Sequence, residues 1–243
     1  MGLATRRRGL GPMPPPRCQC SDACSRPVQK GQTFCDYHRT HGCPIRSPTS
    51  GAEPKFAPEE YNNNKAIQHS HNCFAYAMNK KDAKKIAACR DQGACGFHVP
   101  GKSKGHPDFT GQLGKTCGDV IGRTMADVPR SYLIDFSNTC KPNFSKIGVV
   151  VDEENDLHYY RQDSNGWWSH KPGGRKVTNL DAMGSRIYAP HLASRYYPPE
   201  STANTGLNYS SFCSYMCVPR DEDPNIIGGG RRRRVATRKR RRS

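Results

Sequence analysis

Twelve cysteines in 243 residues constrain the fold of this chain more than any other feature of its sequence. The N-terminal sequence MGLATRRRGLGPMPPP lacks the apolar stretch of a secretory signal, and no apolar run approaches the roughly 18 residues needed to cross a bilayer. We therefore expect synthesis in a reducing compartment, cytoplasm or nucleus, without membrane insertion. In such a compartment, clustered cysteines bind a metal ion more often than they form disulfides.

The first cysteines form a compact cluster between Cys18 and Cys43. Within it, a Cys-x3-Cys pair is followed ten residues later by a Cys-x2-His pair. Each short pair can reach one metal ion from a single turn, which suits a tetrahedral zinc ion. A disulfide-stapled knot is the alternative, and Cys18, His41 and Cys43 could replace a ligand or form a disulfide. The predicted ligands of a structural zinc ion are Cys20, Cys24, Cys35 and His38.

The cysteines that follow this cluster have less specific spacing. Cys89 and Cys95 lie six residues apart, a span that a disulfide or a metal ion could close. The pair Cys213-x3-Cys217 has metal-like spacing, but no second pair of ligands follows it. Two further cysteines have no evident partner in the sequence, namely Cys117 and Cys140.

Positive charge is concentrated at the C-terminal end. The formal net charge is +17, and segment 231–243 holds nine basic residues and no acidic one. Glycines 228–230 precede it and indicate a flexible hinge. We expect this tail to bind a polyanion, either DNA or an acidic protein surface, in a salt-dependent manner, whereas a nuclear-localisation signal or a solvated tail is the alternative. The predicted contacts are Arg231, Arg232, Arg233, Arg234, Arg238, Lys239, Arg240, Arg241 and Arg242.

Composition and hydrophobic periodicity predict one α+β domain with appendages. Asn72 is a candidate N-cap for the first helix of this domain. A β-branched run and two turn signals indicate an antiparallel meander after the helices. The predicted elements are helices over 73–90 and about 112–127, then strands over 146–151, 157–162 and 167–171. The predicted segments are a basic disordered arm (1–17), the Cys/His cluster (18–43), a proline-rich linker or packed arm (44–64), the domain (65–197), an irregular extension with the hinge (198–230) and the tail (231–243).

Cys73 stands where the first predicted helix begins. Unpaired amides and the helix dipole lower the pKa of a thiol there and favour the nucleophilic thiolate. A papain-like hydrolase needs this arrangement, together with a histidine on a following strand and a polar residue that orients it. His158 begins the second predicted strand, and His170 or Asp163 could orient it. Because Asp163 is five residues from His158, the two point to opposite faces of an unbroken strand, which favours His170.

Two stretches of the sequence, SHNCFAYAMN and KIGVVVDEENDLHYYRQDSNGWWSHKPGGRKVTNLDAMG, resemble a little-characterised Cys/His domain family of bacteria and large nucleocytoplasmic DNA viruses. The resemblance covers roughly 47–197. Such domains are distantly similar to NlpC-type and papain-like thiol hydrolases, which implies a papain-like core of two helices and an antiparallel sheet. It also implies Cys73 as nucleophile, His158 as base and His170 as orienting residue. The cysteine cluster and the arginine-rich tail look like those of the viral members.

Three functional hypotheses follow. The first is a structural protein of a large icosahedral DNA virus particle, a minor capsid or core-facing component of the virion. Its partners would be other capsid proteins and, through the tail, packaged DNA or an acidic protein surface. The second is an active papain-like cysteine hydrolase, a peptidase or amidase, packaged in the particle. The third is a DNA-binding protein that uses the zinc module and the tail. Cys73 discriminates the first two, because a hydrolase needs a free, reactive thiol, whereas a structural protein can bury or oxidise it.

Overall fold

The computed structural model describes residues 16–21, 23–109, 115–199 and 206–222. The nine basic residues of the 231–243 tail lie outside the described residues, as does nearly all of the predicted arm 1–17. Within the described ranges no helix is long and apolar enough to cross a membrane.

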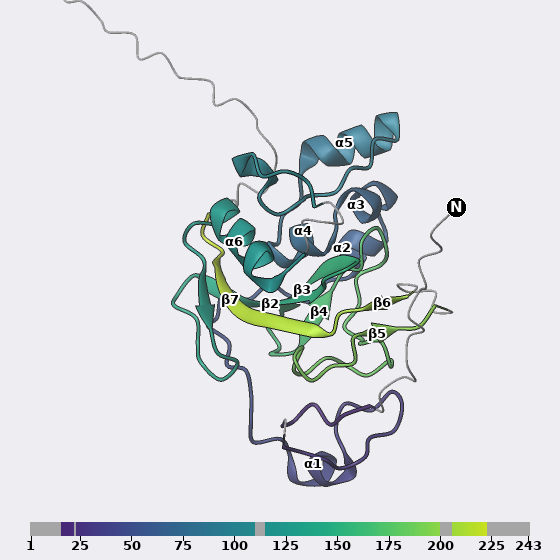
Figure 1. The fold of residues 1–243 in the computed structure, drawn as a ribbon, viewed down its shortest axis with the longest axis vertical. Coiled ribbons are helices and arrows are strands. Elements are labelled where there is room, and N and C mark those ends of the chain that lie inside the picture. Colours follow the sequence, from purple (N-terminus) through teal and green to yellow (C-terminus); the bar gives the residue numbers. More distant parts are fainter. Residues whose placement is uncertain (1–15, 22, 110–114, 200–205, 223–243) are drawn as a thin grey trace, which may run out of the picture.

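The domain combines helices with an antiparallel sheet, so the predicted α+β class is confirmed (Figure 1). The five-stranded sheet has the order β1-β7-β2-β3-β4, and a second, two-stranded sheet pairs β5 with β6. The strands are β1 (Tyr132–Ile134), β2 (Phe144–Asp152), β3 (Asp156–Gln162), β4 (Trp168–His170), β5 (Tyr196–Tyr197), β6 (Leu207–Asn208) and β7 (Ser211–Pro219). The helices are α1 (Asp36–His41), α2 (Glu59–Asn62), α3 (Lys65–Ser70), α4 (Cys73–Ala77), α5 (Ala83–Gln92), the 3-10 helix η1 (Lys102–Lys104) and α6 (Cys117–Asp127).

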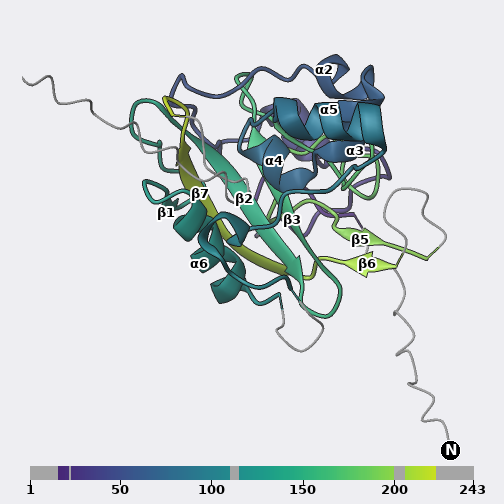
Figure 2. The same cartoon turned by 90° about the horizontal axis from the view of Figure 1, so that it is seen from above.

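The predicted meander is confirmed as β2, β3 and β4, and its register decides which side chains share a face. In β2 and β3, Val149 lies opposite Tyr159, and the next pair is Val150 with His158. Successive side chains of a strand point to opposite faces, whereas directly paired residues share one. Val149 and Tyr159 pack in the apolar cluster under α4 and α6, while Val150 packs with Trp168 on the other side of the sheet. His158 therefore points away from α4 and α6, which lie in front of the sheet in Figure 2.

β7 corrects the prediction of an irregular extension over 198–230. This nine-residue strand lies between β1 and β2, where it pairs antiparallel with both. Two disulfides hold it from either side, Cys117–Cys213 and Cys140–Cys217. Its sequence SFCSYMCVP alternates weakly in polarity, so only pairing with distant strands identifies it as part of the sheet.

The predicted helix over 73–90 is wrong in one respect, because the structure divides it into α4 and α5. Asn72 caps α4 as expected, with its side chain accepting a hydrogen bond from the amide of Ala75. Asn79 then adopts a left-handed backbone conformation (φ 55°), which an α-helix does not tolerate. Asp82 starts α5 by accepting hydrogen bonds from the amides of Lys84 and Lys85. The second predicted helix is α6, which begins at Cys117.

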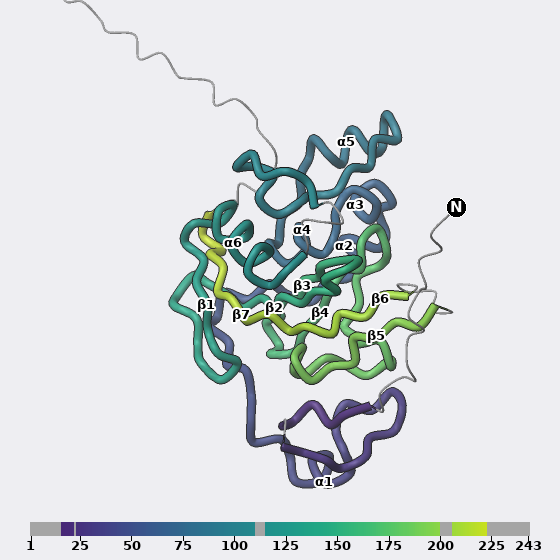
Figure 3. The backbone as a smooth tube through the Cα atoms, in the orientation of Figure 1, coloured from purple at the N-terminus to yellow at the C-terminus, as the bar shows by residue number. Residues whose placement is uncertain are grey.

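The proline-rich segment 44–64 begins as an arm packed against the sheet, the second of its two predicted forms. Ser47 is buried, and its hydroxyl oxygen accepts a hydrogen bond from the Lys146 ammonium at 2.8 Å. The Ser47 carbonyl accepts another from Gln162 at 2.9 Å, and further along the arm Pro54 accepts one from the amide of Ser164. Figure 3 traces this arm from the N-terminal module, at the bottom, up to the sheet.

Candidate functional site

Three thiols and one imidazole converge in the N-terminal module, where their ligand atoms all lie within 4.8 Å of one another. Nδ1 of His38 lies 3.2 Å from Sγ of Cys18, 3.3 Å from that of Cys35 and 3.7 Å from that of Cys24. The sulfurs of Cys24 and Cys35 are 3.8 Å apart. A tetrahedral zinc ion, with bonds of about 2.3 Å to sulfur and about 2.0 Å to nitrogen, separates its ligands by about 3.5–3.8 Å. The cluster Cys18, Cys24, Cys35 and His38 could therefore hold a metal ion.

This ligand set corrects one predicted residue. Cys20 is bonded to Cys43 in a disulfide, so it has no thiolate to offer a metal ion. Cys18 takes its place, and the backbone amide of Cys35 donates to its sulfur at 3.4 Å. Both Cys18 and Cys20 precede Cys24 at short spacing, so the sequence alone does not distinguish them. The fold does, because it directs the Cys20 sulfur toward Cys43.

The buried environment of the cluster favours thiolates that bind a cation over thiolates without one. Burial raises the pKa of the Cys18 thiol to about 11. At Cys35 the same effect of burial is outweighed by hydrogen bonds, first from the backbone amide of His38 and then from the thiols of Cys18 and Cys24, and the pKa is lowered. A metal ion would supply the positive charge that several buried thiolates require.

The other cysteines fall into two groups. Cys89 and Cys95 form a disulfide, one of their two predicted fates. The metal-like spacing of Cys213 and Cys217 is not used for a metal, since each is bonded to a distant cysteine. Apart from the three thiols of the cluster, Cys73 is the one free cysteine.

Cys73 opens α4 as predicted, but its thiol is buried, with 4% of the residue exposed. Its sulfur lies 3.9 Å from the carbonyl oxygen of Leu157, near the start of β3. Burial raises the pKa of this thiol to about 12. The prediction of a lowered pKa is therefore wrong: α4 has only five residues, and loss of solvent outweighs the partial charge at its N-terminus.

His158 and His170 are brought together, whereas Cys73 is not part of their pair. Nε2 of His158 lies 2.7 Å from Nδ1 of His170, which confirms His170 as its hydrogen-bond partner. Nε2 of His170 in turn lies 2.9 Å from the Leu180 carbonyl oxygen. Within the described ranges neither imidazole hydrogen-bonds the Cys73 thiol, because the histidines occupy the face of the sheet opposite to α4.

Both imidazoles are deeply buried, and burial lowers the pKa of His170 to about 4 and that of His158 well below its ordinary value. At neutral pH both rings are therefore uncharged. Asp163, the other predicted orienting residue, instead accepts hydrogen bonds from Nε and Nη2 of Arg161 at 3.2 and 3.0 Å. His158 contacts His170, whereas Asp163 contacts Arg161, in agreement with the prediction that His158 and Asp163 point to opposite faces of the strand.

No protein-family model and no solved structure matches this chain. Insoluble matrix shell protein 1 of Ruditapes philippinarum is 30% identical to it over 142 residues, which cover 58% of this chain and 81% of that protein. The chain belongs to the insoluble matrix shell protein 1 family.

In this member of the insoluble matrix shell protein 1 family, the chemically reactive groups are separated in space. The Cys3His cluster lies in the N-terminal module, which docks on the domain where Phe34 packs edge-on against Tyr188 at 4.9 Å. The thiol of Cys73 and the imidazole of His158 lie on opposite faces of the sheet. The cluster could hold a metal ion, and among the described residues the predicted nucleophile Cys73 and base His158 are not in hydrogen-bond contact.

Proposed function

We propose that this protein is a non-catalytic structural component of an assembled particle or matrix, in which the Cys3His cluster holds a structural zinc ion. The proposal rests on one observation: Cys73 and His158 lie on opposite faces of the sheet. Two disulfides hold the strand β7 in that sheet. A cysteine hydrolase needs the thiol and the imidazole within hydrogen-bond reach. A structural protein does not need this contact, and disulfide cross-links stabilise it in the oxidising conditions outside the cell.

The ligand chemistry supports zinc. Three sulfurs and one imidazole nitrogen form one of the common structural zinc sets, and all four positions of a tetrahedral ion would be filled by protein. Such a closed set stabilises a fold and leaves no open position for a substrate. The module also has little other core, since its buried apolar residues are mainly the cysteines themselves.

Four disulfides support an assembly that is exposed to oxidising conditions. The relative from Ruditapes philippinarum is named an insoluble matrix shell protein, and a structural role in a matrix agrees in the broad sense with the role that we propose for this chain. For this chain we propose the structural role that the sequence resemblance implies, namely that of a minor capsid or core-facing protein of a large icosahedral DNA virus. Other capsid proteins would be its neighbours, and the basic tail would contact packaged DNA or an acidic protein surface.

A papain-like ancestry of the domain is part of the same proposal. It is supported by the packing of α4, which starts at Cys73, against β3, which carries His158. The 2.7 Å contact between His158 and His170 favours a second candidate function, that of an active cysteine hydrolase. That function requires His158 to turn to the helix side of the sheet, which a one-residue shift in the register of β3 would accomplish.

The test is to isolate the particles or insoluble matrix from cells that produce the protein, wash them with high salt and quantify this chain. We expect wild type and Cys73→Ala to be retained equally, and in a fixed ratio to the main structural protein. Recovery of the chain only in the soluble fraction would contradict the structural proposal. Loss of a peptide or amide cleavage product in the Cys73→Ala sample would favour the hydrolase instead.

A further inference from the structure

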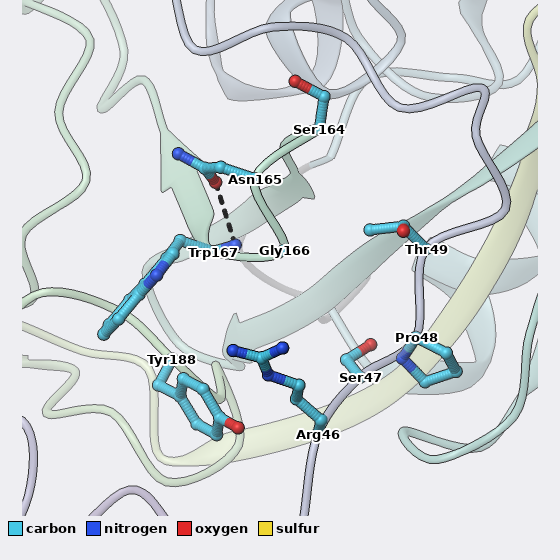
Figure 4. Close-up of a pocket in the computed structure, with 9 residues that line it drawn as sticks. All are labelled: Arg46, Ser47, Pro48, Thr49, Ser164, Asn165, Gly166, Trp167 and Tyr188. Carbon is cyan, nitrogen blue, oxygen red and sulfur yellow. Dashed lines mark hydrogen bonds between the residues drawn. The ribbon is translucent and has the colours of Figure 1, made fainter.

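A pocket of about 390 Å³ lies between the arm and the turn that joins β3 to β4 (Figure 4). Its volume falls within the range of about 300–1,000 Å³ that is usual for small-molecule sites. The arm contributes Arg46, Ser47 and Thr49, and the opposite wall is formed by Asn165, Trp167 and Tyr188. None of the candidate catalytic or metal-binding residues lines this pocket.

The lining offers hydrogen-bond donors and no acidic side chain. In Figure 4 the guanidinium of Arg46 projects into the space between Tyr188 and Ser47. In the part of the chain that the structure describes, no hydrogen bond or ion pair engages Arg46 or the hydroxyl of Thr49. The Ser47 oxygen accepts from buried Lys146, which leaves the Ser47 hydroxyl proton free to donate into the pocket.

The wall opposite the arm is held in place before any ligand binds. The Tyr188 hydroxyl donates to the Ile45 carbonyl at 2.8 Å, and the Asn165 side-chain oxygen accepts from the Trp167 amide at 3.0 Å. The Trp167 ring is supported by the Arg186 guanidinium, 4.2 Å from its centroid, and by the edge of Tyr188. A site with fixed walls loses little conformational entropy on binding.

We infer that this pocket binds an acidic saccharide, with the sugar carboxylate paired to Arg46. A guanidinium forms its best hydrogen bonds with a planar carboxylate, and the hydroxyls of Ser47 and Thr49 add neutral donors beside it. Aromatic walls such as Trp167 pack on the C–H surfaces of a sugar ring. A polyphosphate would need several cations, and Arg46 is the one cation in the lining.

The test uses the full-length protein and digalacturonate, with tryptophan fluorescence and calorimetry as readouts. Salt at about 0.15 M screens long-range attraction to the basic tail. We expect saturable binding that Arg46→Gln weakens by about tenfold or more, because a charged hydrogen bond is lost. Arg46→Lys should recover part of it. Lys30→Gln removes the same charge from an exposed position of the N-terminal module, outside the pocket, and should leave binding unchanged.

Each comparison has an outcome that would overturn the inference. Equal weakening by Arg46→Gln and Lys30→Gln would mean general attraction to charge. Equal binding of the dimethyl ester of digalacturonate would exclude the carboxylate contact. A tetra-aspartate peptide that binds while digalacturonate does not would assign the pocket to acidic peptides. A sulfated disaccharide that binds more tightly than digalacturonate would overturn the carboxylate in favour of sulfate.

Discussion

Nε2 of His158 and Nδ1 of His170 are 2.7 Å apart on the face of the sheet that points away from the Cys73 thiol. The pair is fully enclosed, and the ring of His158 also lies against that of Tyr209, with centroids 5.4 Å apart. A histidine pair that is buried uncharged and linked to a backbone carbonyl stabilises the packing between β3 and β4. In this geometry it cannot take a proton from the thiol.

The Cys73 thiol should react slowly. Burial raises its pKa to about 12, so the thiolate fraction at neutral pH is negligible. We expect iodoacetamide to label Cys73 in the native protein at least about 100-fold more slowly than in the unfolded chain, in which its pKa is near 8.5. Mass spectrometry of alkylated peptides, with and without urea, measures the ratio. Labelling as fast as in the unfolded chain would mean that the native thiol is open to solvent.

Metal binding should depend on Cys18 and not on Cys20. Cys18→Ser removes one of four converging ligands, whereas Cys20→Ser removes only the disulfide to Cys43. We expect Cys18→Ser to lose bound zinc and Cys20→Ser to retain it, as measured by elemental analysis after gel filtration. The reverse result would restore the ligand set that spacing alone predicts. If both variants keep zinc, the cluster is not its site.

Removing Cys140–Cys217, one of the two disulfides that tie β7 to the chain, should destabilise the domain strongly. Cys140–Cys217 spans 77 residues, whereas Cys89–Cys95 spans 6. In the chain-entropy model, loss of the longer loop costs about 2 kcal/mol more free energy of unfolding than loss of the shorter one. Urea unfolding of the double variants Cys140→Ala/Cys217→Ala and Cys89→Ala/Cys95→Ala tests this. Equal losses would show that the free energy of unfolding does not follow the length of the loop that each disulfide closes.

Acid should weaken the fold through its buried histidines, among them His71 and His98. Burial lowers the pKa of His71 to about 4 and that of His98 to about 3, and Nε2 of neutral His71 accepts from the Asp82 amide. The unfolded chain, with histidine pKa values near 6.5, therefore binds more protons below that pH. Stability should be complete above pH 6.5 and fall toward pH 4, by up to about 1.4 kcal/mol per pH unit for each histidine.

Urea unfolding between pH 7 and pH 4.5 measures this slope. His98→Phe should reduce it, whereas His69→Gln, at an exposed position, should not. An unchanged slope in His98→Phe would assign the acid sensitivity to other groups, such as the buried His158 and His170.

The tail should give the protein a salt-dependent affinity for polyanions. A chain that ends at Gly230 lacks nine cationic residues. We expect its affinity for duplex DNA to fall, and the slope of log K against log salt to decrease by up to about 8. Replacing the eight arginines of the tail with lysine should preserve most of the binding, since charge is the feature that matters. An unchanged slope after truncation would place the polyanion contacts elsewhere.

Local sequence determined much of this protein. The run KIGVVV and the turns after it are sufficient to predict β2, β3 and β4, because period-two patterns and turn residues act over a few positions. Asn72 signals the start of α4, and cysteines at short spacing beside His38 signal a metal cluster. The pairing of His158 with His170 also follows, since the two residues lie on neighbouring strands of one hairpin.

Tertiary structure decided what depends on distant contacts. Whether Cys18 or Cys20 joins the cluster is set by the position of Cys43, and β7 becomes a strand only between β1 and β2. The chemistry of Cys73 was decided in the same way. A helix start lowers the pKa of a thiol locally, but burial under the sheet is a property of the whole fold, and here it has the larger effect. The sequence places Cys73, His158 and His170 in one domain. Only the register of β3 places the two imidazoles on the face of the sheet opposite to the Cys73 thiol.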